Sequence, residues 1–222
     1  MDRAFLQRLQ GERVHVASHE TRVVTGGPGF WIVETGSFAV SCAQTADGAA
    51  IGPRRLLFRG GSNQPLWFLP HGPARAFRLL AVPITDVTVH VVSLDTVWAA
   101  LGETPEPAEA LCTECATSHT SCLRTARLPQ NATGVESPSA FTLSAGESAR
   151  AAVQGLWMVV EKGEVHVRGN AAWTRKVESG PMPWTRDLWF TASTGAKVRF
   201  LRGRDVTSAR DLARGFAAVE RI

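Results

Sequence analysis

Short apolar runs separated by turn residues extend along most of the chain and predict a mainly β protein. Strand-like runs lie at residues 29–42, 77–84 and 87–94, and glycine, proline or asparagine separates the runs. Seven or eight such strands at a spacing of about 8–12 residues are typical of a sandwich, jelly roll or barrel. A second β-region follows over residues 141–201.

One pattern of apolar and polar positions occurs twice, as GFWIVETGSFAV at residues 29–40 and as GLWMVVEKGEVHV at residues 155–167. Each copy contains glycine, tryptophan, an apolar run, glutamate and a second glycine before an alternating strand, and the second copy has one extra apolar residue. Strands joined by a tight glycine turn predict a β-hairpin in each copy, with Trp31 and Trp157 at equivalent places. The repeat favours two β-domains of similar design.

Helical spacing of apolar residues is confined to a few segments. It predicts helices at the N-terminus, over residues 93–102, around residues 108–122 and over residues 207–222, where the tail is amphipathic. We therefore expect two tandem jelly-roll or β-roll domains with short flanking helices. The expected boundaries are 1–102 for the first β-roll with its N-terminal helix, 103–139 for a linker rich in proline and cysteine, and 140–222 for the second β-roll with its C-terminal helix.

Charge and hydropathy exclude several classes of protein. The net charge of the 222 residues is +4, and the arginines are scattered along the sequence, which argues against a nucleic-acid partner. No stretch reaches the ~18 apolar residues that cross a bilayer, and the N-terminus has no apolar signal-peptide core. We expect a cytoplasmic protein that does not itself insert into a membrane.

Several short motifs accompany the repeat: GPRRLLFR at residues 52–59, VW at 97–98, LSAGE at 143–147 and MPWT at 182–185. In this order they resemble the N-terminal region of NHLP/NHLM-type bacteriocin-system ABC transporter permease/ATPase subunits. The resemblance implies cyclic-nucleotide-binding-like, cupin-like β-roll domains. In that family membrane helices and an ATPase domain follow, whereas this chain ends at Ile222 and contains no GxxxxGK[S/T] phosphate loop. We expect an excised piece of a transporter or a stand-alone relative of that piece.

The same resemblance places a ligand site near residues 60–68. Gly60, Gly61 and Ser62 would allow close approach of a phosphate, and Arg75 or Arg78 would supply positive charge. The segment itself contains no acidic residue, however, and a proline there removes one amide donor. A simple loop between strands is the alternative.

A cluster of metal-ligating residue types lies in the linker. Cys112, Cys115, His119 and Cys122 fall within eleven residues, and zinc takes four such ligands. Redox chemistry or packing of small residues are the alternatives. The histidines show no pair with cupin spacing, and no GxSxG motif is present, so we predict that the chain is not an enzyme and needs no cofactor unless zinc binds.

Together these observations predict a non-catalytic regulatory or docking module of a peptide exporter, associated with the membrane only through a transporter region outside this chain. Its expected partner is a transporter subunit or the leader peptide of a precursor. The alternatives are a small-ligand sensor of the cyclic-nucleotide-binding class and a cupin-like metalloenzyme. Whether the two rolls pack within one chain or through a homodimer is left open.

Overall fold

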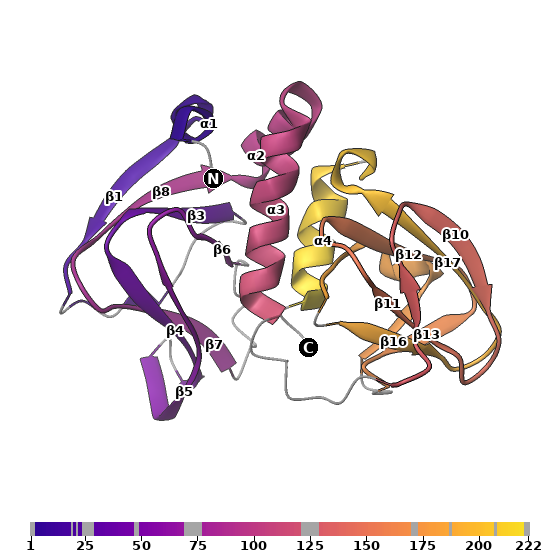
Figure 1. Cartoon of the computed structure of the whole chain (residues 1–222). Coiled ribbons are helices and arrows are strands. Elements are labelled where there is room, and N and C mark those ends of the chain that lie inside the picture. The colour runs from indigo at the N-terminus through magenta and orange to yellow at the C-terminus, as the bar shows by residue number, and fades with distance from the viewer. Residues whose placement is uncertain are drawn as a thin grey trace. The chain divides into compact units, whose positions relative to one another are not determined.

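The computed structural model describes residues 3–18, 20, 22–23, 29–46, 49–68, 77–120, 129–169, 173–186, 188–206 and 208–219. These fall into two compact units, Met1–Val97 and Trp98–Ile222. Each unit contains two sheets built almost entirely from antiparallel strands (Figure 1). The prediction of a mainly β chain with two β-rolls and short flanking helices is confirmed. No helix in the described segments is long and apolar enough to span a membrane.

The first unit is a roll of two facing sheets, with strand orders β1-β8-β3-β6 and β2-β7-β4-β5. Its core contains side chains of both sheets, among them Val33 and Val89 from one and Phe38 and Val40 from the other. The elements are α1 (Arg3–Arg8), β1 (Gly11–Val16), β2 (Arg22–Val23), β3 (Gly29–Thr35), β4 (Ser37–Ala46), β5 (Ala49–Gly61), β6 (Pro65–Phe68), β7 (Phe77–Pro83) and β8 (Val87–Ser93). Helix α2 (Leu94–Glu103) follows where a helix over residues 93–102 was predicted, and its Thr96 amide donates to the capping Ser93 hydroxyl at 3.1 Å.

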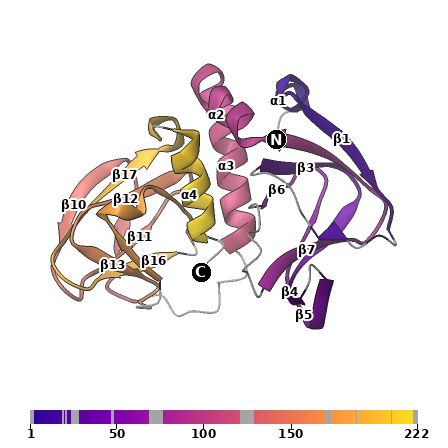
Figure 2. The ribbon, with the colours of Figure 1, turned by 180° about the vertical axis from the view of Figure 1, so that it is seen from behind.

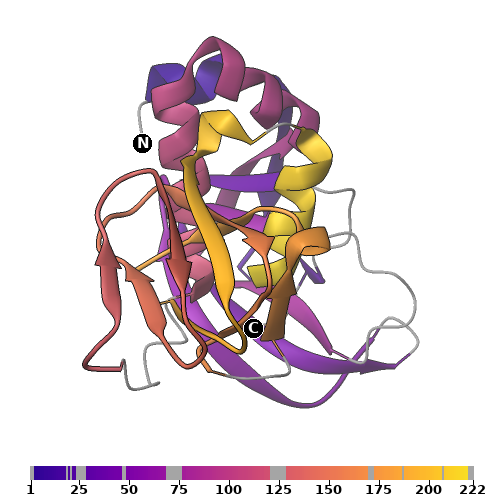
Figure 3. The same ribbon diagram turned by 90° about the vertical axis from the view of Figure 1, so that its right-hand side faces the viewer.

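The second unit repeats this plan, with sheets β10-β17-β12-β15 and β14-β13-β16-β11-β9 (orange to yellow strands in Figure 3). Three aromatic rings, of Trp184, Phe190 and Phe200, contact one another in its core. The elements are α3 (Pro105–Thr120), β9 (Thr133–Val135), β10 (Ser139–Leu143), β11 (Ser148–Ala151), β12 (Leu156–Lys162), β13 (Glu164–Val167), β14 (Thr174–Lys176), η3 (Val177–Ser179), β15 (Met182–Trp184), β16 (Trp189–Ala192), β17 (Ala196–Arg202), η4 (Gly203–Asp205) and α4 (Ala209–Val219).

Helices α3 and α4 lie side by side in the second unit (Figures 1 and 2). The predicted amphipathic tail is the helix α4, whose Leu212 and Phe216 are buried. The rings of Phe216 and of Trp157 on β12 pack edge to face, with their centroids 5.7 Å apart. The predicted helix around residues 108–122 is α3, which buries Leu111 together with small residues such as Cys112 and Ala116.

The chain changes sheets where a hairpin was predicted. β3 pairs with β6 and β8, whereas β4 pairs with β5 and β7 in the facing sheet, and β12 and β13 are separated in the same way. The predicted hairpins are therefore wrong. Gly36 (φ +88°) and Gly163 (φ +73°) form these corners, pressed against the backbone carbonyls of Asp86 and Gly195. Any side chain would collide there, so glycine allows the strand to cross to the other sheet.

Strand pairing also corrects the alignment of the two repeats. The ladder register shifts at Glu34 in the β3–β8 pair and at Glu161 in the β12–β17 pair, so these two glutamates correspond. Counting back from them, Trp157 matches Phe30, and not Trp31 as predicted. Trp31 lines the interior of its roll, whereas Trp157 packs outside its sheet. The extra residue lies between tryptophan and glutamate, and one residue reverses the face of a strand.

Candidate functional site

The predicted ligand segment is a tight turn between β5 and β6. The Gly61 amide donates to Gln64 Oε1 at 2.9 Å, and the Gln64 amide donates to the Gly61 carbonyl at 3.2 Å. Gly60 lies against the Phe38 ring, and Ser62 is exposed at the turn. The two glycines thus serve the turn and close packing, and the Gly61 amide already has an acceptor.

The arginines predicted to join this site are not brought to it by the described structure. Arg78 lies on β7 opposite Ala43, and its side chain is outside the described atoms. Arg75 lies outside the described residues altogether. Phosphate binding by this segment stays a prediction.

A polar groove of about 630 Å³ opens on the first roll, beside the same turn. It is comparable with ligand sites, which typically measure about 300–1,000 Å³. Its walls come from five separate segments: Leu6 and Gln7 of α1, Arg13 of β1, Glu34 and Thr35 of β3, Asn63 of the β5–β6 turn and His90 of β8.

Three charged or titratable side chains form a row across the groove. Arg13 lies opposite His90 in the β1–β8 ladder, and Glu34 is the bulged residue of β3 beside β8. Arg13 Nε donates to Glu34 Oε2 at 2.8 Å, and His90 Nδ1 lies 3.9 Å from Glu34 Oε1. The side chains of Arg13, Glu34 and His90 are 69%, 29% and 16% exposed. The exposure of the side chains thus falls along the row, from the exposed guanidinium of Arg13 to the mostly buried imidazole of His90.

The imidazole of His90 is fixed by the backbone. Its Nε2 lies 2.8 Å from the Leu9 carbonyl, which can only accept, so Nε2 carries the hydrogen. Its Nδ1 then faces Glu34 Oε1 beyond hydrogen-bond distance. Among the described residues Oε1 of Glu34 accepts no hydrogen bond, and it is available to a hydroxyl or amine of a ligand.

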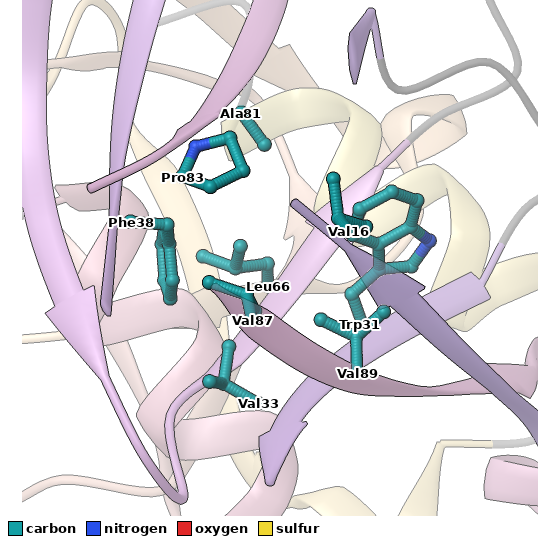
Figure 4. Close-up of a pocket in the computed structure, with 9 residues that line it drawn as sticks. All are labelled: Val16, Trp31, Val33, Phe38, Leu66, Ala81, Pro83, Val87 and Val89. Atoms are coloured by element: carbon teal, nitrogen blue, oxygen red, sulfur yellow. The ribbon is translucent and has the colours of Figure 1, made fainter. Parts of the chain in front are cut away.

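An apolar cavity of about 20 Å³ lies inside the same roll (Figure 4). Its walls combine both sheets: Val16, Trp31, Val33, Phe38, Leu66, Ala81, Pro83, Val87 and Val89. Figure 4 shows the rings of Phe38 and Trp31 on opposite sides of Leu66 and Val87. A void this small and apolar stays dry.

Matching the rolls through their registers shows how their cores differ around this cavity. Ala81 pairs with Val40 on β4 as Phe190 pairs with Val167 on β13, so Ala81 stands where the second roll has a phenylalanine. By the same matching, Val91 stands where the second roll has Phe200. In exchange, Trp31 and Phe38 stand where the second roll has Met158 and Val165, so the two rolls carry their aromatic rings at different positions.

The cysteine cluster lies on α3. Cys112 and Cys115 are buried, and the Cys115 Sγ lies 3.8 Å from His119 Nδ1, which in turn lies 2.9 Å from the Cys115 carbonyl. Burial, with a contribution from Glu109, raises the pKa of the Cys112 thiol to about 12. No group of three metal-ligating side chains is arranged to hold an ion among the described residues, and Cys122 lies outside them. Zinc binding stays a prediction.

The groove residues were not singled out from the sequence, although one signal was present. Glutamate recurs before the glycine corner in both repeats, at Glu34 and Glu161. Arg13 and His90 are far from Glu34 in sequence and become its neighbours only through strand pairing.

No protein-family model and no curated protein matches the sequence. Solved structures do match: unbound oxidised CprK is 15% identical over 54% of this chain and 53% of its own, with a TM-score of 0.37. The reduced CO-sensing protein from R. rubrum is 20% identical over 55% and 52%, with a TM-score of 0.39. The cAMP-bound PfPKA-R is 11% identical over 95% and 74%, with a TM-score of 0.30.

This chain spans about half the length of CprK and of the CO-sensing protein. Likeness at this level says nothing about the ligand, partner or activity of the chain. The β-roll assignment depends on the strand pairing itself. The resemblance to peptide exporters stays a prediction.

Proposed function

We propose that the chain is a non-catalytic, ligand-responsive regulatory module whose first roll binds a small molecule in the groove around Arg13, Glu34 and His90. The observation that carries the proposal is the convergence of a cation, a carboxylate, an imidazole and two amides on one groove of about 630 Å³. A few convergent polar groups in a concave site are typical of small-molecule binding.

The chemistry of the groove favours a small anion that also carries hydroxyls. Arg13 uses Nε for Glu34, which leaves its terminal guanidinium nitrogens to pair with a phosphate or carboxylate. Glu34 Oε1 and the Asn63 side chain offer partners to hydroxyl groups. Cyclic nucleotides belong to this class.

Binding is a better description of this site than catalysis. Glu34 is already paired with Arg13, and His90 is anchored to the Leu9 carbonyl, so both side chains are held in place as partners for a ligand. Docking within a peptide exporter, expected from the resemblance, stays a prediction that the groove neither requires nor opposes.

Calorimetric titration of the purified chain tests the proposal. Cyclic AMP, cyclic GMP, a cyclic dinucleotide and a sugar phosphate are titrated separately, with inorganic phosphate as the reference for charge alone. We expect saturable binding of at least one hydroxyl-bearing anion, tighter than that of phosphate. Absence of heat with every compound at millimolar concentration would overturn the proposal.

A further inference from the structure

The sheet β2-β7-β4-β5 carries only positive charge. Its strands hold Arg22, Arg54, Arg55, Arg59 and Arg78. None of the four strands contains an aspartate or glutamate, and between Glu34 and Asp86 the only acidic residue in the sequence is Asp47. The sequence suggested scattered arginines, but strand pairing gathers five of them on one sheet of a chain whose net charge is +4.

Strand β5 is the edge of this sheet and is unusually long, at 13 residues. Among the described strands it pairs only with β4. Leu57 and Phe58 pack against the roll core and anchor the strand, whereas Arg54, Arg55 and Arg59 are exposed. Two apolar side chains are also exposed on it, Ile51 at 41% and Leu56 at 50%.

We propose that β5 receives an extended acidic segment of a partner protein as an additional strand of this sheet. The outer edge of an edge strand presents backbone donors and acceptors to an incoming strand. Arg54, Arg55 and Arg59 are exposed along this strand, so acidic side chains of the added strand meet cations. Leu56 offers the added strand an apolar neighbour. This inference is independent of the ligand groove.

The composition of β5 favours a polypeptide of opposite charge over other occupants. A second copy of the chain, paired edge to edge through β5, would place arginine against arginine, which is unfavourable. Strands that bind single-stranded nucleic acid use exposed aromatic rings, and the one aromatic residue of β5, Phe58, packs on the core. The backbone edge itself adds binding energy only for another strand.

Fluorescence anisotropy with the full chain tests the proposal. The probe is a labelled peptide of alternating glutamate and valine. One reference peptide replaces each valine by proline, which keeps the charge and removes alternate backbone donors. A second replaces glutamate by lysine, and a labelled single-stranded oligonucleotide tests nucleic acid. Replacement of Arg54, Arg55 and Arg59 by glutamine is compared with a charge-matched control on the second unit, in which exposed Arg186, Arg202 and Arg210 become glutamine.

We expect the glutamate–valine peptide to bind, and both reference peptides to bind at least tenfold more weakly. The β5 triple variant should lose at least tenfold in affinity, and the control triple variant should lose less than twofold. Equal binding of the proline peptide would show attraction by charge alone and would overturn strand addition. Tighter binding of the oligonucleotide, or no binding of the acidic peptide, would overturn the choice of partner.

Discussion

Glu34 and Glu161 occupy the same position in the two rolls but have different partners. Glu161 accepts from Lys197 Nζ at 2.9 Å and from Arg199 Nε at 2.8 Å, so each of its oxygens has a cation. In the first roll, His90 stands in the place of Arg199 and leaves one oxygen of Glu34 without a hydrogen bond among the described residues. One glutamate is therefore satisfied within the fold, and the other is available to a ligand.

Replacement of Glu161 by glutamine should make the Tm of the protein less dependent on pH in the acid range. The hydrogen bond from Lys197, aided by the charges of Lys197 and Arg199, lowers the pKa of Glu161. A carboxyl whose pKa is lower in the folded state stabilises the fold above its unfolded pKa of about 4.3, and this stability is lost as the pH falls through the folded pKa. The Tm of wild type and Glu161→Gln, measured by circular dichroism between about pH 6 and pH 3, should therefore converge at low pH. Parallel curves would contradict this role.

Added volume should have opposite effects in the two rolls. Ala81→Val places two methyl groups beside the apolar cavity and should stabilise the first roll by up to about 1 kcal/mol. Ala192→Val places the same groups in the filled core of the second roll and should destabilise it by about 1–3 kcal/mol. Urea unfolding of both variants measures the difference. Equal destabilisation would show that the first roll is as tightly filled as the second.

The corner glycine should be far less replaceable than a glycine in open space. Gly36 and Gly52 both have positive φ, 88° and 72°, but only Gly36 lies against a backbone carbonyl, that of Asp86. Gly52→Ala should lower the free energy of unfolding by about 1–2 kcal/mol, the strain of a left-handed residue. Gly36→Ala should lose more than this, because backbone must also move. Chemical denaturation of both variants measures their free energies of unfolding. Equal losses in the two variants would mean that the corner at Gly36 is not tightly packed.

Cys112 should resist alkylation in the folded chain. Burial raises the pKa of its thiol to about 12, and the thiolate is the reactive form. Burial also raises the pKa of Cys42, but Arg55 partly opposes this and the residue is only half-buried. Iodoacetamide at about pH 8, close to the ordinary thiol pKa, should therefore modify Cys42 before Cys112, and urea should remove the difference. Mass spectrometry of the peptides shows which cysteine is alkylated first. Equal rates of alkylation of Cys42 and Cys112 in the folded chain would contradict the prediction.

Local periodicity was enough to predict many of the strands and the helices, although β9 lies in the segment predicted as a linker. Alternation over residues 87–94 became β8, and the spacing of Leu212 and Phe216 became α4, because burial of one face dictates both patterns. The corner at Gly36 was predicted as a hairpin, since strand, glycine and strand look the same whether the strands pair or separate. The difference comes from the backbone carbonyl of Asp86, which is distant in sequence and lies against Gly36 where the chain crosses to the other sheet.

The candidate site could not be read from the sequence because it is assembled by pairing between distant strands. Arg13, Glu34 and His90 come from β1, β3 and β8 and carry no common spacing. The same holds for the arginines of the sheet β2-β7-β4-β5, where β2 and β7 are adjacent although Arg22 and Arg78 are far apart in the chain. Residue types were visible, but their neighbours depended on the topology.

The most direct measurement is calorimetric titration of cyclic AMP, or whichever anion of the panel binds wild type most tightly, into Glu34→Gln and its matched control Glu161→Gln. Loss of at least tenfold in affinity for Glu34→Gln, with Glu161→Gln within twofold of wild type, is the predicted result. Equal affinity of all three proteins would contradict a ligand site at Glu34 in the first roll.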